Sequence, residues 1–129
     1  MALSKFVTEQ EINASRRMLY PYISTPSGLA QWFADDCTVD EDKVFYFKWE
    51  DEVHKAKMVA HRTNSYARFE FFEDEDDGEC PYVELRVEIN ELTQTVFIRI
   101  IDYSDINDEL ESRELWENLF NNLKEIVGG

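Results

Sequence analysis

The residues of this chain that could do chemistry are few and widely spaced. Its two histidines, His54 and His61, lie seven positions apart, a spacing that puts them on opposite faces of an unbroken strand. Side chains on opposite faces cannot share a metal ion. Cys37 and Cys80 have no metal-binding spacing and are expected to be reduced thiols, with a disulfide as the alternative. These residues therefore predict no metal site.

An acidic segment comes closest to a metal-binding motif. Glu73, Glu75 and Asp77 occupy positions 1, 3 and 5 of a calcium-loop template, with Gly78 at position 6 and Glu84 at position 12. The template is broken, because position 1 is Glu rather than Asp, a proline interrupts the loop, and the flanking segments read as strands. We expect a solvated acidic turn and no calcium site.

Length and charge limit the classes of function. With 129 residues and 43% hydrophobic composition, the chain fits one folded domain over residues 1–129. Its formal net charge of −15 repels phosphate backbones and anionic headgroups, which argues against nucleic acid and membrane surfaces as partners. The N-terminus lacks the apolar run of a signal peptide, and no window is apolar enough for a transmembrane helix. A cytoplasmic location is expected.

The N-terminal elements that must position these residues can be read from local signals. A strand is predicted at 5–13, followed by a helix at about 14–20 that Pro21 ends or kinks. A second short helix opens at Thr25, a capping residue followed by proline at the first helical position. Its apolar face is predicted from residues at i, i+3 and i+4, which are Leu29, Trp32 and Phe33.

The rest of the chain is predicted to be mostly strands. Polar turns separate the candidate strands, which favours an antiparallel meander. The final segment, 108–127, has apolar residues at helical spacing, acids at its start and glycines at its end, so it is predicted to be one long helix. The six strands are expected at 38–39, 44–50, 53–63, 66–72, 82–90 and 95–103.

This order of elements resembles that of the Bet v 1-like, or START-like, superfamily. Two segments are similar to its Aha1-type branch: Thr25-Pro-Ser-Gly-Leu-Ala-Gln-Trp-Phe-Ala-Asp to the second helix, and Glu114-Leu-Trp-Glu-Asn-Leu-Phe-Asn-Asn-Leu-Lys to the closing helix. The resemblance implies an α+β helix-grip fold, in which a curved antiparallel sheet wraps around a long C-terminal helix. It brings no catalytic residue and no cofactor. It implies packing roles for Leu29, Trp32, Phe33, Trp116 and Leu123.

Alternation along the strands divides the side chains between the two faces of the sheet. One face is almost entirely apolar and is expected to line the space against the final helix, where Ala56, Ala60 and Ala67 would leave room. His54, near a strand end, is the one titratable residue there and is expected at the rim, so this wall argues against catalysis. The candidates for contacting a bound ligand are Phe47, Met58, Phe69, Leu85, Ile98 and Phe120.

The opposite face carries charges of alternating sign, which suit cross-strand pairing on a wet surface. Phe97, Ile101 and Tyr103 lie on the same face in the last strand. Exposed apolar strand surface can mark a partner-binding or dimer face, and an ordinary half-covered strand is the alternative.

Three functions remain open on these patterns. The first is non-catalytic binding of a hydrophobic or lipid-like molecule between sheet and C-terminal helix. The second is a protein-interaction module, similar to the co-chaperone-like Aha1 branch, whose interior is filled by Phe45, Phe47, Trp49, Phe69 and Phe71. The third is an enzyme of the cyclase or hydratase kind, with Tyr20, Tyr22 or His54 at the mouth of the cavity.

Overall fold

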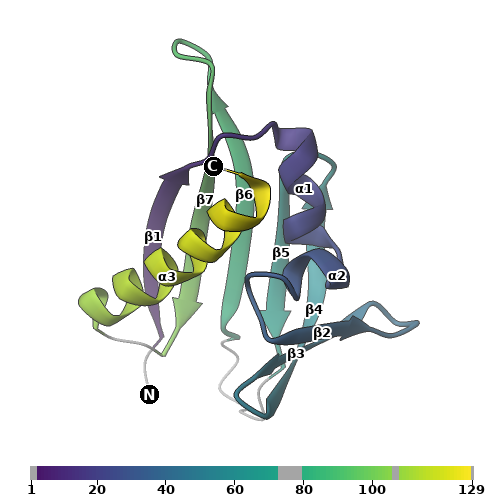
Figure 1. Cartoon of the computed structure of the whole chain (residues 1–129). Helices are drawn as coiled ribbons and strands as arrows, with labels where there is room; N and C mark the ends of the chain where they lie inside the picture. Colours follow the sequence, from purple (N-terminus) through teal and green to yellow (C-terminus); the bar gives the residue numbers. More distant parts are fainter. Residues whose placement is uncertain (1–2, 73–79, 106–107, 129) are drawn as a thin grey trace.

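The computed structural model describes residues 3–72, 80–105 and 108–128. Seven antiparallel strands form one sheet in the order β1-β7-β6-β5-β4-β3-β2, and the three helices lie over one side of it (Figure 1). This confirms the predicted helix-grip fold. The elements are β1 Ser4–Glu11, α1 Arg16–Ser24, α2 Pro26–Leu29, β2 Asp36–Val39, β3 Val44–Trp49, β4 Glu52–Arg62, β5 Tyr66–Phe71, β6 Tyr82–Asn90, β7 Thr95–Ser104 and α3 Glu109–Val127.

The first helix differs from its prediction, because α1 continues through Pro21 to Ser24. Ser15 caps its start by accepting a hydrogen bond from the Met18 N–H at 3.0 Å. The proline lacks an N–H, but its carbonyl still accepts the Thr25 N–H at 3.1 Å, so the helix does not end there. A Cβ at position 28 would lie 2.1 Å from the Pro21 carbonyl oxygen, so only glycine lets α2 pack this closely on α1.

The second helix is shorter than its apolar spacing predicted. As predicted, Thr25 caps it and proline occupies its first turn, but the helix ends at Leu29. Trp32 and Phe33 follow in a turn and are nevertheless buried with Leu29. Tertiary packing, not helical periodicity, brings these three side chains to the core.

The hairpin between β3 and β4 is closed without glycine. Glu50 and Asp51 form the turn with φ angles of 50° and 71°, a left-handed conformation that normally favours glycine or asparagine. Asp35 compensates part of this strain, because its carboxylate accepts the Glu50 N–H at 2.9 Å. The turn therefore depends on a residue outside the hairpin.

A bulge at Val59 interrupts β4 and corrects the predicted assignment of faces. Met58 pairs with Phe69, a residue of the inner face, whereas Ala60 pairs with Arg68 of the outer face. The extra residue reverses the alternation beyond it. The prediction that Ala60 lines the inner face is therefore wrong.

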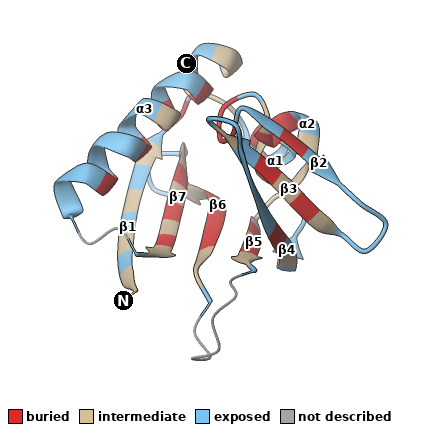
Figure 2. Cartoon of the chain, turned by 90° about the horizontal axis from the view of Figure 1, so that it is seen from below, coloured by how far each residue is buried: buried red, intermediate tan, exposed pale blue. Residues whose placement is uncertain are grey.

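The core lies between the inner face of the sheet and the helices (Figure 2). Hydrogen bonds from two tryptophan indoles hold the turn after α2 against this core. Trp32 donates to the Tyr22 carbonyl at 2.8 Å, and Trp49 donates to the Phe33 carbonyl at 2.7 Å. Each buried N–H thus has an acceptor, as burial of a polar group requires.

The closing helix begins and ends at the predicted signals. Asp108 caps α3 by accepting the Leu110 N–H at 3.0 Å, and Gly128 ends it with φ of 86°. The apolar stripe of α3 faces the sheet through Trp116, Phe120 and Leu123. Among the described residues, no helix has the length and apolar character needed to cross a membrane.

Candidate functional site

The structure brings the six predicted ligand-contacting residues into the interior between sheet and α3. Met58 of β4 is half-buried and lies opposite Phe69 of β5. The other five are almost completely buried: Phe47, Phe69, Leu85 and Ile98 are 0% exposed and Phe120 is 2% exposed. Their role toward a ligand stays a prediction.

Aromatic rings fill much of this interior. Phe47 makes edge contacts with Phe69 at 5.6 Å between ring centroids and with Phe33 at 5.3 Å. Phe33 also stacks on Trp116 of α3, with centroids 5.8 Å apart. These separations are those of favourable aromatic pairs, so the rings contact one another directly.

The bulge in β4 changes the position of the second histidine. His61 pairs with Ala67, a residue of the inner face, so the prediction that the two histidines lie on opposite faces is wrong. His61 is exposed, and its Nδ1 lies 3.4 Å from the Tyr20 hydroxyl of α1. Burial raises the pKa of Tyr20, so this phenol stays protonated at neutral pH.

His54 lies at the rim, as predicted, where its ring is 5.5 Å from that of Trp49. Its Nε2 is 3.5 Å from a Glu52 carboxylate oxygen. Seven strand positions, at ~3.3 Å each, separate His54 from His61, so distance still keeps the two from sharing a metal. The two histidines therefore form separate sites, one at each end of the strand.

Sequence reasoning missed a buried carboxyl group on the inner face. Asp102 of β7 accepts a hydrogen bond from Trp116 Nε1 of α3 at 2.8 Å. Burial raises the pKa of Asp102, and the indole hydrogen bond partly opposes that shift. The signal was present in the sequence, since Asp102 follows Ile98 and Ile100 at strand alternation. This contact joins the closing helix to the sheet.

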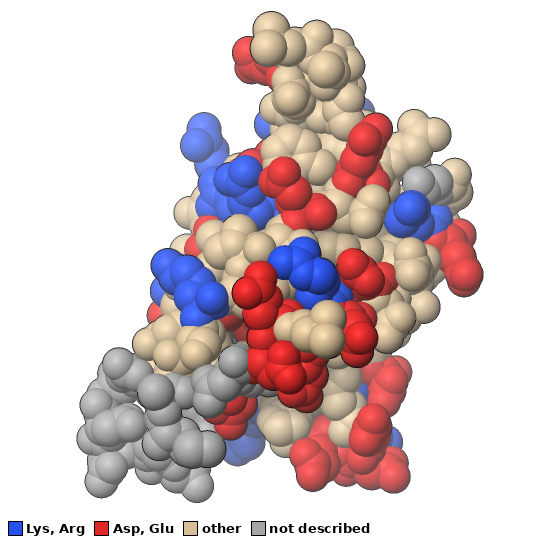
Figure 3. Space-filling view, turned by 90° about the vertical axis from the view of Figure 1, so that its left-hand side faces the viewer, with Lys and Arg blue, Asp and Glu red and all other residues tan. Residues whose placement is uncertain are grey.

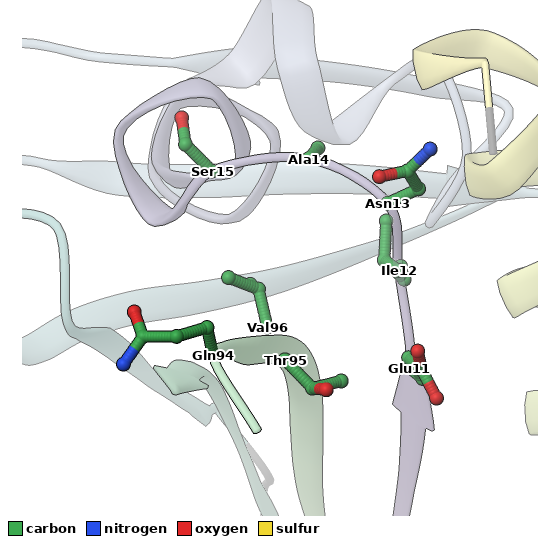
Figure 4. A pocket seen from close by; sticks show the side chains of 8 residues that line it. All are labelled: Glu11, Ile12, Asn13, Ala14, Ser15, Gln94, Thr95 and Val96. Carbon is green, nitrogen blue, oxygen red and sulfur yellow. The ribbon is translucent and has the colours of Figure 1, made fainter. Parts of the chain in front are cut away.

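An open groove of about 350 Å³ lies where β1 leaves the sheet, beside the start of β7. None of the six predicted ligand-contacting residues lines it, and much of its lining is polar (Figure 4). The lining residues are Glu11, Ile12, Asn13, Ala14, Ser15, Gln94, Thr95 and Val96.

The cysteines and the acidic template offer no reactive centre in the described part of the chain. Burial raises the pKa of the Cys37 thiol to about 12, so it stays protonated and unreactive at neutral pH. Cys37 and Cys80 are both free thiols, as predicted. No group of three metal-ligating side chains occurs among residues 3–72, 80–105 and 108–128. Residues 73–79 of the calcium template lie outside the described residues.

The outer face of the sheet carries ion pairs across strands, as predicted, and also along single strands. Other than for Arg86 and Glu84, the N···O distances in this network run from 2.9 to 3.8 Å. Two arginines also lie over tyrosine rings, Arg68 over Tyr82 at 3.8 Å and Arg86 over Tyr66 at 4.8 Å. Acidic and basic side chains lie next to one another on the β1 side (Figure 3). The network runs through Glu70, Arg68, Glu84, Arg86, Glu88, Arg99 and Glu9.

The strand register divides the charge of the molecule unevenly. Among the described strand residues, eight Lys and Arg and six Asp and Glu point to the outer face, so these strand residues have a formal charge of +2. The other five basic and 22 acidic residues give the rest of the chain −17. The eight basic residues are Lys5, Lys48, Lys55, Lys57, Arg62, Arg68, Arg86 and Arg99. The six acidic residues are Glu9, Glu11, Asp36, Glu70, Glu84 and Glu88.

Comparison with known families gives a match over the whole chain. The sequence profile of the START-like superfamily domain matches residues 1–129. No curated protein matches the chain. The match agrees with the order of strands and helices described above.

Solved structures with the same fold have low to moderate sequence identity. A Bacteroides fragilis protein is 34% identical, with 98% of this chain and 93% of that chain covered and a TM-score of 0.63. The Aha1 dimer from Colwellia psychrerythraea is 15% identical over 95% of this chain and 94% of that one, with a TM-score of 0.73. A Mesorhizobium loti protein is 12% identical over 97% of both chains, with a TM-score of 0.76.

Proposed function

The chain belongs to the START-like superfamily, and on that premise we propose that it is a non-catalytic protein-interaction module with a filled core. The observation that carries this proposal is the complete burial of Phe47, Phe69, Leu85 and Ile98 by other parts of the chain. A void large enough for a ligand, about 300 Å³ or more, would leave accessible surface on the side chains that line it. These four side chains have none.

The chemistry of the interior also supports a role without catalysis. Asp102 is held by the Trp116 indole, and His54 and His61 lie at opposite ends of β4. General acid-base catalysis needs a titratable group within hydrogen-bond reach of a bound substrate. The aromatic rings that contact one another fill much of the interior that such a substrate would have to enter.

Binding of an apolar or lipid-like molecule is the second candidate, favoured by one observation. Met58, Trp49 and Phe71 are only partly buried where they pack against the edge of the core. A small apolar molecule could contact them without a preformed internal cavity. The same molecule would have to displace aromatic contacts in order to reach Phe47 and Phe69.

Titration with a neutral hydrophobic dye, such as Nile red, distinguishes the two proposals. A filled core predicts no saturable increase in fluorescence. The substitution Met58→Trp should then lower the free energy of unfolding by roughly 1–3 kcal/mol, because extra volume strains a packed core. Thermal and urea unfolding measure that change.

A cavity predicts the opposite pair of results. The dye would bind with one-to-one stoichiometry, and Met58→Trp would weaken its binding while leaving stability nearly unchanged. That outcome would replace the interaction module with the ligand-binding proposal. Turnover of any compound, abolished by His61→Ala or Tyr20→Phe, would overturn both.

A further inference from the structure

The outer side of β4 has a stripe of exposed side chains unlike the rest of the outer face. Figure 2 shows most of β4 as exposed, in contrast to β6 and β7. Along the strand, alternation and the bulge at Val59 turn basic and apolar residues outward together. We call this set the β4 stripe: Val53, Lys55, Lys57, Val59 and Arg62.

The β4 stripe contains three cations. Among the described residues, none of Lys55, Lys57 and Arg62 forms an ion pair, although the chain has 28 acidic residues. Lys57 lies opposite Glu70 in the register, but the Glu70 carboxylate is 3.8 Å from Arg68. Among the described residues, the stripe is thus a local excess of positive charge.

Apolar side chains lie between and beside these cations. Val53 is 58% exposed and Val59 is 44% exposed. Phe72, which is 51% exposed, lies alongside the stripe, because its backbone N–H donates to the Lys55 carbonyl at 2.9 Å. Exposed apolar side chains ringed by charges are typical of surfaces that bind other proteins.

We infer that the β4 stripe binds an extended acidic segment of a partner protein that also carries apolar side chains. The inference deepens the proposed function and rests on it. Carboxylates of the partner would pair with Lys55, Lys57 and Arg62, while its apolar residues would cover Val59 and Phe72. The stripe spans ten residues of β4 from Val53 to Arg62, so a segment of roughly ten residues matches it at ~3.3 Å per residue.

Charge favours a different protein over a second copy of this chain. Two copies bring −15 each and repel one another. At physiological salt the repulsion is screened beyond about 8 Å, so a short acidic segment lying on the stripe meets mainly the nearby lysines. Binding should therefore be local, weak to moderate in affinity and sensitive to salt.

The test uses a labelled peptide of roughly ten residues, in which Glu and Asp flank one Phe and one Leu. Fluorescence anisotropy measures its affinity, and backbone amide shifts in NMR locate its site. We expect shifts on β4 and β3, and at least about tenfold weaker binding to Lys55→Glu/Lys57→Glu, because reversing two charges converts attraction into repulsion. Val59→Ser should weaken binding without removing a charge.

The matched control is Arg16→Glu/Arg17→Glu, which makes the same change in net charge at the exposed start of α1. The helices lie over the inner face of the sheet, whereas the β4 stripe lies on the outer face (Figure 1). The affinity of this control for the peptide should therefore stay within about twofold of the parent, because salt screens the remaining charge effect. Both double variants should keep the thermal midpoint of the parent, because all four side chains are exposed.

Several results would overturn the inference. Absence of shifts on β4, or equal weakening by both double variants, would show that no specific site is there. Binding of the β4 stripe to phosphatidylserine vesicles instead of the peptide would indicate a membrane surface, and a concentration-dependent dimer lost in Lys55→Glu/Lys57→Glu would indicate a second copy. The dye titration is independent of these results, so a filled core with no peptide binding would leave the proposed function standing with a different docking face.

Discussion

The same alternation of residues gives the sheet a buried inner face and a partly solvated outer face. On the inner face, Phe47 and Phe69 are fully buried among other rings, and the buried carboxyl of Asp102 accepts a hydrogen bond from an indole. On the outer face, Arg86 and Glu84 belong to a network that remains partly wet. The stability of the inner face therefore depends on how closely its side chains fit together. The outer face tolerates substitutions better, because water can replace a lost hydrogen-bond partner.

The largest expected difference between the faces concerns two neighbouring residues of β3. Phe47→Ala should lower the free energy of unfolding by about 3–5 kcal/mol, because it removes a buried ring and leaves a cavity. Tyr46→Ala, on the outer face, should cost only about 1–1.5 kcal/mol, mainly the loss of the 2.9 Å hydrogen bond from its hydroxyl to Asp40. Urea unfolding measures both, and equal costs would mean that β3 is packed on both faces.

A second prediction concerns Asp102, the buried carboxyl group of the inner face. The pKa of Asp102 is raised in the folded state, so folding favours its protonated form. Its contribution to stability is therefore most favourable at low pH and is lost as pH rises from the unfolded pKa of about 3.9 through the raised folded pKa. Above that range the fold carries the full cost of a buried charge.

Asp102→Asn should remove that cost and still accept the Trp116 N–H, so we expect it to raise the free energy of unfolding at pH 7 by about 1 kcal/mol. Asp102→Leu is the matched control, since it leaves the buried indole N–H without a partner and should cost about 1–3 kcal/mol. Thermal unfolding at pH 7 and at pH 3 measures both variants. A loss of stability in Asp102→Asn at pH 7 would show that the carboxylate is worth more than its burial costs.

The smallest expected effect is on the outer face. A double-mutant cycle with Arg86→Met and Glu84→Gln should give a coupling free energy of about 1 kcal/mol or less, because the pair is partly exposed. The coupling should shrink in 1 M NaCl, where the Debye length is about 3 Å. A coupling free energy of several kcal/mol that does not change with salt would mean that the network is shielded from solvent as well as the inner face is.

The two faces also differ in how far they could be predicted. Alternation assigned the charges of β5 and β6 to the outer face correctly and placed Phe97 and Ile101 on that face, where they lie opposite Glu88 and Glu84. The same rule misplaced Ala60 and His61, because the bulge at Val59 adds one residue. Nothing in the local pattern of β4 marks that insertion, since it arises from pairing with β5.

The packing density of the interior could not be predicted in the same way. Six residues were expected to contact a ligand, five of them on one apolar wall of the sheet and the sixth, Phe120, on the final helix. Whether that wall encloses a void depends on how closely Phe33 and Trp116 approach it from the opposite side. Such distances depend on the positions of whole elements, and no local pattern contains them.

By itself, the sequence determined the kinds of elements, their order and most of the division between the buried and the solvated face of the sheet. These follow from signals within a few residues, such as the cap at Asp108 and the 3.6-residue period of α3. Only the tertiary structure decided the register of β4 beyond Val59, the Asp102 to Trp116 contact and the burial of Phe47. The physical reason is that register and packing are set by residues far apart in the chain, whose contacts exist only after the sheet and α3 have come together.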